Sequence, residues 1–405
     1  MPHTEMTYDF SQPTSRRGTC SYKWDSAPEG VVPLWVADMD FATAPAVRRA
    51  VEKRAAHGIF GYTLVPNSYY EAVCRWFSQR HRWNINAADI IYTSGVVPAI
   101  SAIIEALTLP GDQVVVLTPV YNCFFSSIRN NGCEAAASPL LYDEAAKAYR
   151  IDFADLEQRL AGERARLLLL CNPHNPGGRV WTRAELEEVA RLCLKHGVRV
   201  VSDEIHCELT LADNAYTPFG SLPDELSAGS ITCCSPTKAF NIAGLQIANI
   251  VCRDAAVRER INRAININEV CDVNPFGVDA LQAAYSPEGA AWLDGLRAYL
   301  TQNYDYTARF FRERLPQFPM MQMEGTYLAW IDCRVLGMAA ETIEQRLMQE
   351  HKVWVNAGSM YGAAGEGFIR INFACQQQRL ADGLQRVEHG LKALLAEKGR
   401  HWQTR

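Results

Sequence analysis

One lysine, Lys238, lies in the stretch SPTKAFNIAGLQ, between two apolar runs that have the composition of interior strands. A fully buried lysine is rare unless its charge is paired or its amine is used in chemistry. A primary amine can form a Schiff base with a carbonyl compound. The position of Lys238 therefore suggests a reactive amine just after a buried strand.

Polar residues of other types also follow apolar runs. In an open α/β sheet, ligands bind outside the carboxyl ends of the strands, and one parallel sheet would bring these ends to a single rim. A lysine, a carboxylate, an aromatic ring, an amide and hydroxyl groups together suit a phosphorylated aromatic cofactor held as a Schiff base. The segments at the predicted strand ends that carry these groups are residues 94–95, 119–121, 172–177, 203–206 and 235–238.

The elements that must position these groups show in the alternation of short apolar runs with helical patterns. Apolar runs without period-two alternation, separated by helices, are typical of a mostly parallel sheet with helices on both faces. Thr182 and Glu185 have the spacing of a capping box, and Gly197 stands where a helix would stop. The expected strands are residues 90–94, 114–119, 166–173, 198–205, 230–235 and 248–252.

The sequence changes in character near Trp292. A long helical pattern covers residues 292–315, followed by apolar runs at 326–333, 353–358 and 368–375 and an amphipathic helix over about 379–398. This order predicts a separate, smaller α+β domain. We expect an N-terminal segment associated with the small domain (1–45), a large cofactor-binding domain (46–288) and the small C-terminal domain (289–405).

Composition and charge narrow the class of protein. A chain of 405 residues is long for one core, so two domains are expected. A net charge of −5 argues against nucleic acid as the main partner. The first residues have no apolar signal core and the apolar runs are short for a membrane span, so we expect no membrane partner and a cytoplasmic location. Irregular cysteine and histidine spacing predicts reduced structural thiols and no metal site.

The order and spacing of the motifs resemble the fold-type I pyridoxal-phosphate enzymes of the class I/II aminotransferase superfamily. Within that superfamily the chain is most similar to the MalY/PatB group of cystathionine β-lyases, or C–S lyases. The resemblance covers nearly the whole chain, and the order of its motifs is highly specific. These motifs are LWVADMDFATAP, GIFGYT, CNPHNPGGRVW, SDEIH, SPTKAFNIAGLQ and GEGFIRINFAC.

The resemblance implies catalytic and ring-binding roles. Lys238 would hold pyridoxal 5'-phosphate as a Schiff base and then remove the Cα proton of the substrate. Asp203 would pair with the pyridinium nitrogen and keep it protonated. Tyr121 would stack on the ring, and Asn175 would donate to its phenolic oxygen. Outside their motifs, Tyr121 is as consistent with a core tyrosine and Asn175 with a turn residue.

The resemblance also implies the contacts to phosphate and substrate. Ser235 and the backbone amides around Gly95 and Val96 would hold the phosphate at a helix N-terminus, where free N–H groups favour anions. Tyr62 would reach the phosphate of the neighbouring subunit, so we expect a homodimer with its active site at the interface. Taken alone, Tyr62 is also consistent with a packed tyrosine. Arg370, inside an apolar strand, would bind the substrate carboxylate in a bidentate contact.

Two departures from the general aminotransferase pattern match the C–S lyase group. His206 stands three residues after Asp203, where many relatives carry a tyrosine, and we count it among the cofactor-binding residues. Gln246 stands eight residues after Lys238, where many carry a phosphate-binding arginine. The expected reaction is β-elimination from a small amino-acid substrate, L-cystathionine or another cysteine S-conjugate, to a thiol, pyruvate and ammonia. An aminotransferase using the same residues, or a lyase with an additional regulatory binding role, are the alternatives.

Overall fold

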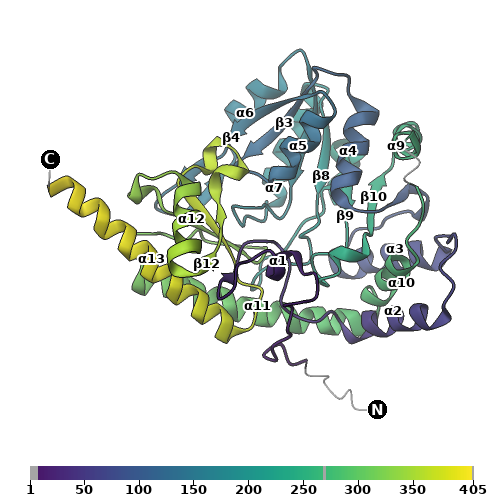
Figure 1. Cartoon of the computed structure of the whole chain (residues 1–405). Helices are drawn as coiled ribbons and strands as arrows, with labels where there is room; N and C mark the ends of the chain where they lie inside the picture. The colour runs from purple at the N-terminus through teal and green to yellow at the C-terminus, as the bar shows by residue number, and fades with distance from the viewer. Residues whose placement is uncertain (1–7, 268–270, 404–405) are drawn as a thin grey trace.

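A seven-stranded sheet forms the centre of the larger part of the molecule (Figure 1). The computed structural model describes residues 8–267 and 271–403. Only β10 runs antiparallel to its neighbours in this sheet; all other neighbouring strands pair in parallel. The order is β2 (Ile90–Thr93), β10 (Ala248–Cys252), β9 (Ile231–Cys234), β8 (Arg199–Asp203), β7 (Ala165–Cys171), β3 (Gln113–Thr118) and β4 (Glu134–Pro139).

The expected strands are therefore confirmed, with ends that shift by one or two residues, and the sheet is mostly parallel as predicted. The edge strand β4 is an addition. Its sequence, EAAASP, has no β-branched or aromatic residue, so the strand pattern is missing there. β4 pairs with β3 over its whole length, and this pairing stabilises the strand although its residues have low strand propensity.

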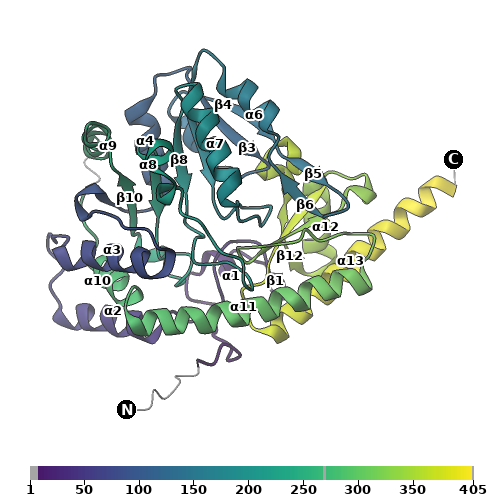
Figure 2. The same cartoon turned by 180° about the vertical axis from the view of Figure 1, so that it is seen from behind.

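Helices cover both faces of this sheet because successive strand residues point to opposite sides. Val114 and Val116 pack in one apolar cluster with α4, α5 and α9, whereas Val115 and Leu117 pack in another with α6 and α7. Figures 1 and 2 show α4 and α5 on one face and α7 and α8 on the other. The bounds are α4 (Val96–Leu107), α5 (Asn122–Asn130), α6 (Phe153–Leu160), α7 (Arg183–Lys195), α8 (Asp224–Ser227) and α9 (Ala255–Ile267).

The helix predicted after Val180 is α7, and its capping box is confirmed. The Thr182 hydroxyl accepts from the Glu185 backbone N–H at 3.2 Å, and the Glu185 carboxylate accepts from the Thr182 N–H at 2.8 Å. Gly197 follows the helix with φ of +67°, the left-handed conformation in which glycine ends helices.

A second, antiparallel sheet carries the C-terminal strands that the sequence predicted: β11 (Leu328–Asp332), β14 (Phe368–Asn372) and β13 (Asn356–Ala357). The helices of this region are α11 (Pro287–Arg314), α12 (Ala340–His351) and α13 (Gln377–Gln403). Figure 2 shows the long α11 extending along the base of the molecule below both sheets.

The N-terminal region joins both parts. Strand β1 (Val32–Pro33) pairs in parallel with β12 (Val353–Trp354) in a separate two-stranded sheet, so residues 32–33 lie beside the segment that leads into β13. The remaining helices and strands are α1 (Tyr22–Asp25), α2 (Pro45–His57), α3 (Asn67–His81), α10 (Pro275–Ala284), and the hairpin of β5 (Leu141–Asp143) and β6 (Ala148–Arg150). Short 3-10 helices are η1 (Ala87–Asp89), η2 (Phe219–Ser221), η3 (Ala243–Leu245), η4 (Arg334–Leu336), η5 (Gly358–Tyr361) and η6 (Ala363–Gly365).

All thirteen cysteines are unpaired thiols, and most of them are buried. Among residues 8–267 and 271–403, no helix has the length and apolar character needed to cross a membrane.

Candidate active site

Most of the predicted site residues line one cavity of about 320 Å³. It lies at the carboxyl ends of β3, β7, β8 and β9, as expected for an open α/β sheet, and one residue reaches it from β14 of the second sheet. The predicted residues brought together there are Val96, Tyr121, Asn175, Asp203, His206, Lys238 and Arg370.

Lys238 reaches this cavity from the turn after β9. Its Nζ donates to the carbonyl oxygen of Ala37 at 2.6 Å, and the Tyr327 hydroxyl donates to the same oxygen at 3.0 Å. Burial and the nearby charge of Arg370 lower the pKa of the Lys238 amine from 10.5 to about 8. A substantial fraction of the amine is then neutral, and so nucleophilic, slightly above neutral pH.

Asp203 ends β8 and is buried, with 3% of its surface exposed. Its carboxylate accepts a hydrogen bond from the Ile205 backbone N–H at 3.1 Å. Burial raises the pKa of Asp203 to about 7, although the charge of Lys238 opposes the shift. A buried carboxylate with so little stabilisation favours a cationic partner inside the cavity.

Arg370 is held by neutral acceptors. Its guanidinium donates to Oδ1 of Asn175 at 3.0 Å, to Oδ1 of Asn356 at 2.9 Å and to the Trp35 carbonyl at 3.0 Å. The same group lies 4.9 Å from the centre of the Tyr361 ring. Its buried Nε has no hydrogen-bond partner among the described residues. Since the observed partners carry no charge, the full positive charge of Arg370 remains available to an anionic ligand.

His206 and Tyr121 complete the walls around these groups. Burial, together with the charges of Lys238 and Arg370, lowers the pKa of His206 to about 3, so its imidazole is neutral at ordinary pH. Its buried Nδ1 has no partner in the described chain. Tyr121 lies directly before α5, and burial raises the pKa of its hydroxyl. Both side chains therefore present uncharged rings to the cavity.

Only some of the residues predicted to bind the phosphate lie at the cavity. Gly95 is the N-cap of α4, and Val96 and Val97 at the start of that helix line the cavity, where helix N–H groups are free for an anion. Ser235 is buried outside the lining. Its hydroxyl donates to the Ile247 carbonyl at 2.5 Å and accepts from the Thr237 N–H at 3.1 Å. Phosphate binding by Ser235 stays a prediction.

Tyr62 lies outside the cavity, in the segment between α2 and α3. Its side chain is 98% exposed, and its neighbours Ile59, Phe60 and Leu64 are also exposed. Within one chain, this tyrosine contacts none of the cavity groups to which its predicted role refers.

Several lining residues had no predicted role. Trp35 and Ala37 contribute backbone carbonyls to Arg370 and Lys238, and Asn356 contributes a side-chain amide. The motif LWVADMDFATAP marked the segment as characteristic, but its residue types do not reveal a carbonyl contact. The other lining residues without a predicted role include Tyr22, Asn122, Cys123, Met360 and Tyr361.

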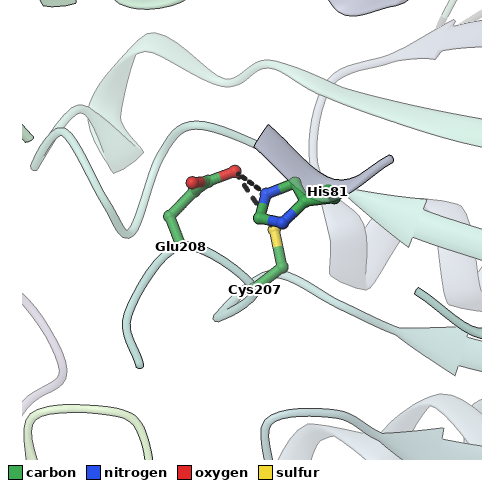
Figure 3. Close-up of side chains that lie close together, drawn as sticks. All are labelled: His81, Cys207 and Glu208. Carbon is green, nitrogen blue, oxygen red and sulfur yellow. Dashed lines mark hydrogen bonds and ion pairs between the residues drawn. The ribbon is translucent and has the colours of Figure 1, made fainter. Parts of the chain in front are cut away.

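Cys207 and Glu208, which follow His206 in the sequence, form a cluster with His81 from α3 (Figure 3). The types suit a metal, but the Glu208 carboxylate is already engaged. It contacts His81 Nε2 at 2.6 Å, Trp76 Nε1 at 2.6 Å and the Arg80 guanidinium at 3.3 Å. Burial alone would raise the pKa of Glu208, but the His81 and Arg80 charges lower it to about 2. We therefore interpret the cluster as an ion-pair network that ties α3 to the segment following His206.

The chain belongs to the aminotransferase class I and II family, whose model matches residues 29–387. It is 43% identical over 388 residues to the cystathionine beta-lyase PatB of Bacillus subtilis, covering 95% of this chain and 100% of that protein. Among solved structures, cystalysin from Treponema denticola, which contains pyridoxal 5'-phosphate, has a TM-score of 0.92 at 34% identity, over 96% of this chain and 100% of that one. A PLP-bound putative aminotransferase from Clostridium difficile has the same TM-score at 37% identity, over 95% and 100%.

Proposed function

We propose that this protein is a pyridoxal-phosphate-dependent carbon–sulfur β-lyase that cleaves L-cystathionine or a related cysteine S-conjugate to a thiol, pyruvate and ammonia. The observation that carries the proposal is the convergence of Lys238, Asp203 and Arg370 on one cavity. The identity of 43% with a cystathionine beta-lyase over almost the whole chain supports the same conclusion.

The cavity groups fit pyridoxal 5'-phosphate. Asp203 offers a buried carboxylate to a protonated ring nitrogen, and Lys238 offers an amine with a lowered pKa to the carbonyl carbon. The amide of Asn175 gives its oxygen to Arg370, which leaves the NH₂ group as a donor to a ring oxygen. The orphan Nδ1 of His206 is a further polar atom that a ligand would satisfy. We assign the phosphate to the N-terminus of α4 at Gly95.

The chemistry that the cofactor supplies when bound is withdrawal of the electron pair left at Cα of the amino acid. Arg370 binds the substrate carboxylate and so fixes the direction of the Cα–H bond. Neutral Lys238 accepts that proton at Nζ. The C–S bond then breaks, the thiolate leaves with the bonding pair, and hydrolysis of the remaining three-carbon unit gives pyruvate and ammonia. Asp203 would pair with the protonated ring nitrogen when the cofactor is bound.

An aminotransferase is the second candidate, favoured by the 37% identity to a structure described as a putative aminotransferase. Both reactions begin with loss of the Cα proton, so products distinguish them. With L-cystathionine and no added keto acid, a lyase releases pyruvate, ammonia and homocysteine continuously in equal amounts. An aminotransferase stops after one equivalent per site and resumes when 2-oxoglutarate is added, and that result would overturn the lyase proposal.

We further propose that the protein acts as a homodimer in the cytoplasm, with Tyr62 reaching the phosphate of the neighbouring site. The support is the exposed apolar segment that carries it, in which Ile59 is 68%, Tyr62 98% and Leu64 88% exposed. Exposed apolar groups that lie this close together are typical of an interaction surface.

The division into a 1–45 segment, a 46–288 domain and a 289–405 domain remains our proposal for the chain. The pairing of β1 with β12 supports the association of the N-terminal segment with the small domain. Residues 1–7 of that segment lie outside the described residues.

A further inference from the structure

The outer wall of the cavity is aromatic. Trp35 stacks on Trp354, with ring centres 4.2 Å apart and planes at 12°, and Tyr22 lies 5.1 Å from Trp35 on a tilted ring. Trp35 Nε1 donates to the Lys23 carbonyl at 3.3 Å, which fixes the platform further. Tyr22, Trp35 and Met360 all line the cavity. Tyr22 is 70% and Met360 41% exposed, so they stand where the cavity opens.

The charged groups of the cavity already have assignments. Asp203, Lys238 and Arg370 are the only charged side chains in its described lining. In the proposed reaction the first two serve the cofactor and the third serves the substrate's own carboxylate. No charged side chain of the described lining is then left to pair with a second ammonium or carboxylate, such as the distal end of cystathionine carries.

The charged side chains near this wall are paired with one another. The Asp38 carboxylate lies 2.6 Å from Arg16, and the buried Asp40 carboxylate lies 3.3 Å from Lys23 and 3.0 Å from Arg379. None of these five side chains lines the cavity. The segment that carries Tyr62, residues 58–65 (GIFGYTLV), contains no charged side chain, so in the proposed dimer it would bring no charge to the neighbouring site.

We propose that Tyr22, Trp35 and Met360 form a subsite for the sulfur substituent of the substrate, and that the substituent it takes is apolar or aromatic. This inference rests on the proposed lyase function and narrows the range of sulfur substituents that the enzyme prefers. An aromatic substituent would pack against the rings of Trp35 and Tyr22, whereas the zwitterionic end of cystathionine would lose water without gaining a counter-charge. S-aryl, S-benzyl and longer S-alkyl cysteines are then the preferred class.

The direct test compares S-benzyl-L-cysteine, L-cystathionine and S-methyl-L-cysteine on the holoenzyme, with pyruvate release as the readout. We expect kcat/KM for the benzyl substrate to exceed that for cystathionine by about ten-fold or more. This is the size of effect expected when one polar group of cystathionine loses its water and finds no partner in the protein. A higher kcat/KM for cystathionine would overturn the subsite while leaving the lyase function intact. Absence of pyruvate from all three substrates would instead overturn the lyase function.

Two exposed positions test the subsite without disturbing the core. Tyr22→Ala should lower the benzyl-to-methyl ratio of kcat/KM about three- to ten-fold, the range of one lost aromatic contact. Leu109→Ala is a matched control, because Leu109 is 72% exposed and lies outside the cavity, and its ratio should not change. Met360→Arg adds a cation at the opening and should raise the cystathionine-to-benzyl ratio about ten-fold. Unchanged ratios in both cavity variants would refute the assignment.

Discussion

The amine of Lys238 and the carbonyl oxygen of Ala37 lie 2.6 Å apart, although the two residues are 201 positions apart in the sequence. The contact holds the amine inside the cavity and ties it to the N-terminal segment. The Tyr327 hydroxyl donates to the same oxygen at 3.0 Å, so the carbonyl is itself fixed. The reactive nitrogen is thus positioned by a backbone carbonyl, which has no titratable charge.

Uptake of pyridoxal 5'-phosphate by the cofactor-free protein should depend on pH through Lys238. Only the neutral amine attacks a carbonyl carbon, so the rate constant should rise with pH to a plateau above a midpoint of about 8. Stopped-flow absorbance of the forming chromophore measures it. A midpoint near the ordinary 10.5 would show that burial does not act on this amine. Lys238→Ala should bind no cofactor covalently, and borohydride reduction should label no other lysine.

Arg370→Leu should lower kcat/KM about a hundredfold, because a misdirected Cα–H bond is removed slowly. Arg370→Lys keeps the charge but loses the planar pair of donors, so it should recover only part of this loss. Arg183→Leu, at a side chain 52% exposed on α7, serves as the control and should match the unchanged enzyme. Steady-state pyruvate release is the measurement, and a wild-type rate in Arg370→Leu would remove this residue from substrate binding.

Asp203→Asn should abolish turnover and yet stabilise the cofactor-free protein at pH 7. The folded pKa of about 7 lies above the unfolded value of 3.8, so the folded state binds more protons between these values and its stability falls as pH rises through them. The substitution removes that penalty, a gain on the order of 4 kcal/mol at pH 7. Urea unfolding at pH 4 and pH 7 should show a smaller pH effect in the variant. An equal effect in both proteins would contradict the raised pKa.

Glu208→Gln should destabilise the protein at pH 7, the opposite of the effect expected for Asp203→Asn. The folded pKa of Glu208, about 2, lies below its unfolded value of 4.5, so its ion pairs stabilise the protein above about pH 4.5 and are lost as pH falls towards 2. The variant should lose about 3 kcal/mol of unfolding free energy at pH 7, because His81 and Arg80 lose their buried partner. Glu225→Gln on the exposed side of α8 is the control. Equal stability of both variants would show that the network is dispensable.

Sharing of the active site between subunits is tested by mixing. Tyr62→Phe and Lys238→Ala chains should each be impaired, and hybrid dimers should regain activity, because one of their two sites contains both wild-type residues. Activity should be followed after subunit exchange has been demonstrated with tagged chains. Exchange without recovered activity would place Tyr62 in its own subunit's site or outside the chemistry.

Sequence patterns predicted the parts of this site that depend on side-chain type at strand ends. Asp203 and Lys238 follow apolar runs, and a parallel sheet brings such ends together, so their meeting could be foreseen. The acceptors around Lys238 and Arg370 could not, because the carbonyls of Ala37 and Trp35 leave no trace in residue type. Strand direction was also hidden, since β10 (ANIVC) has the same apolar composition as its parallel neighbours and yet runs antiparallel.

The pairing of Val32 with Val353 sets an order of events during synthesis. Ribosomes make the N-terminal segment first, but its partners in the fold include the backbone of Trp354 and the side chains of Arg370 and Asn372. The contacts of residues 32–36 with β12 and β14 can therefore form only after residues 353–372 have been translated. A nascent chain halted before residue 353 lacks these partners, Arg370 among them, and so lacks a finished catalytic centre.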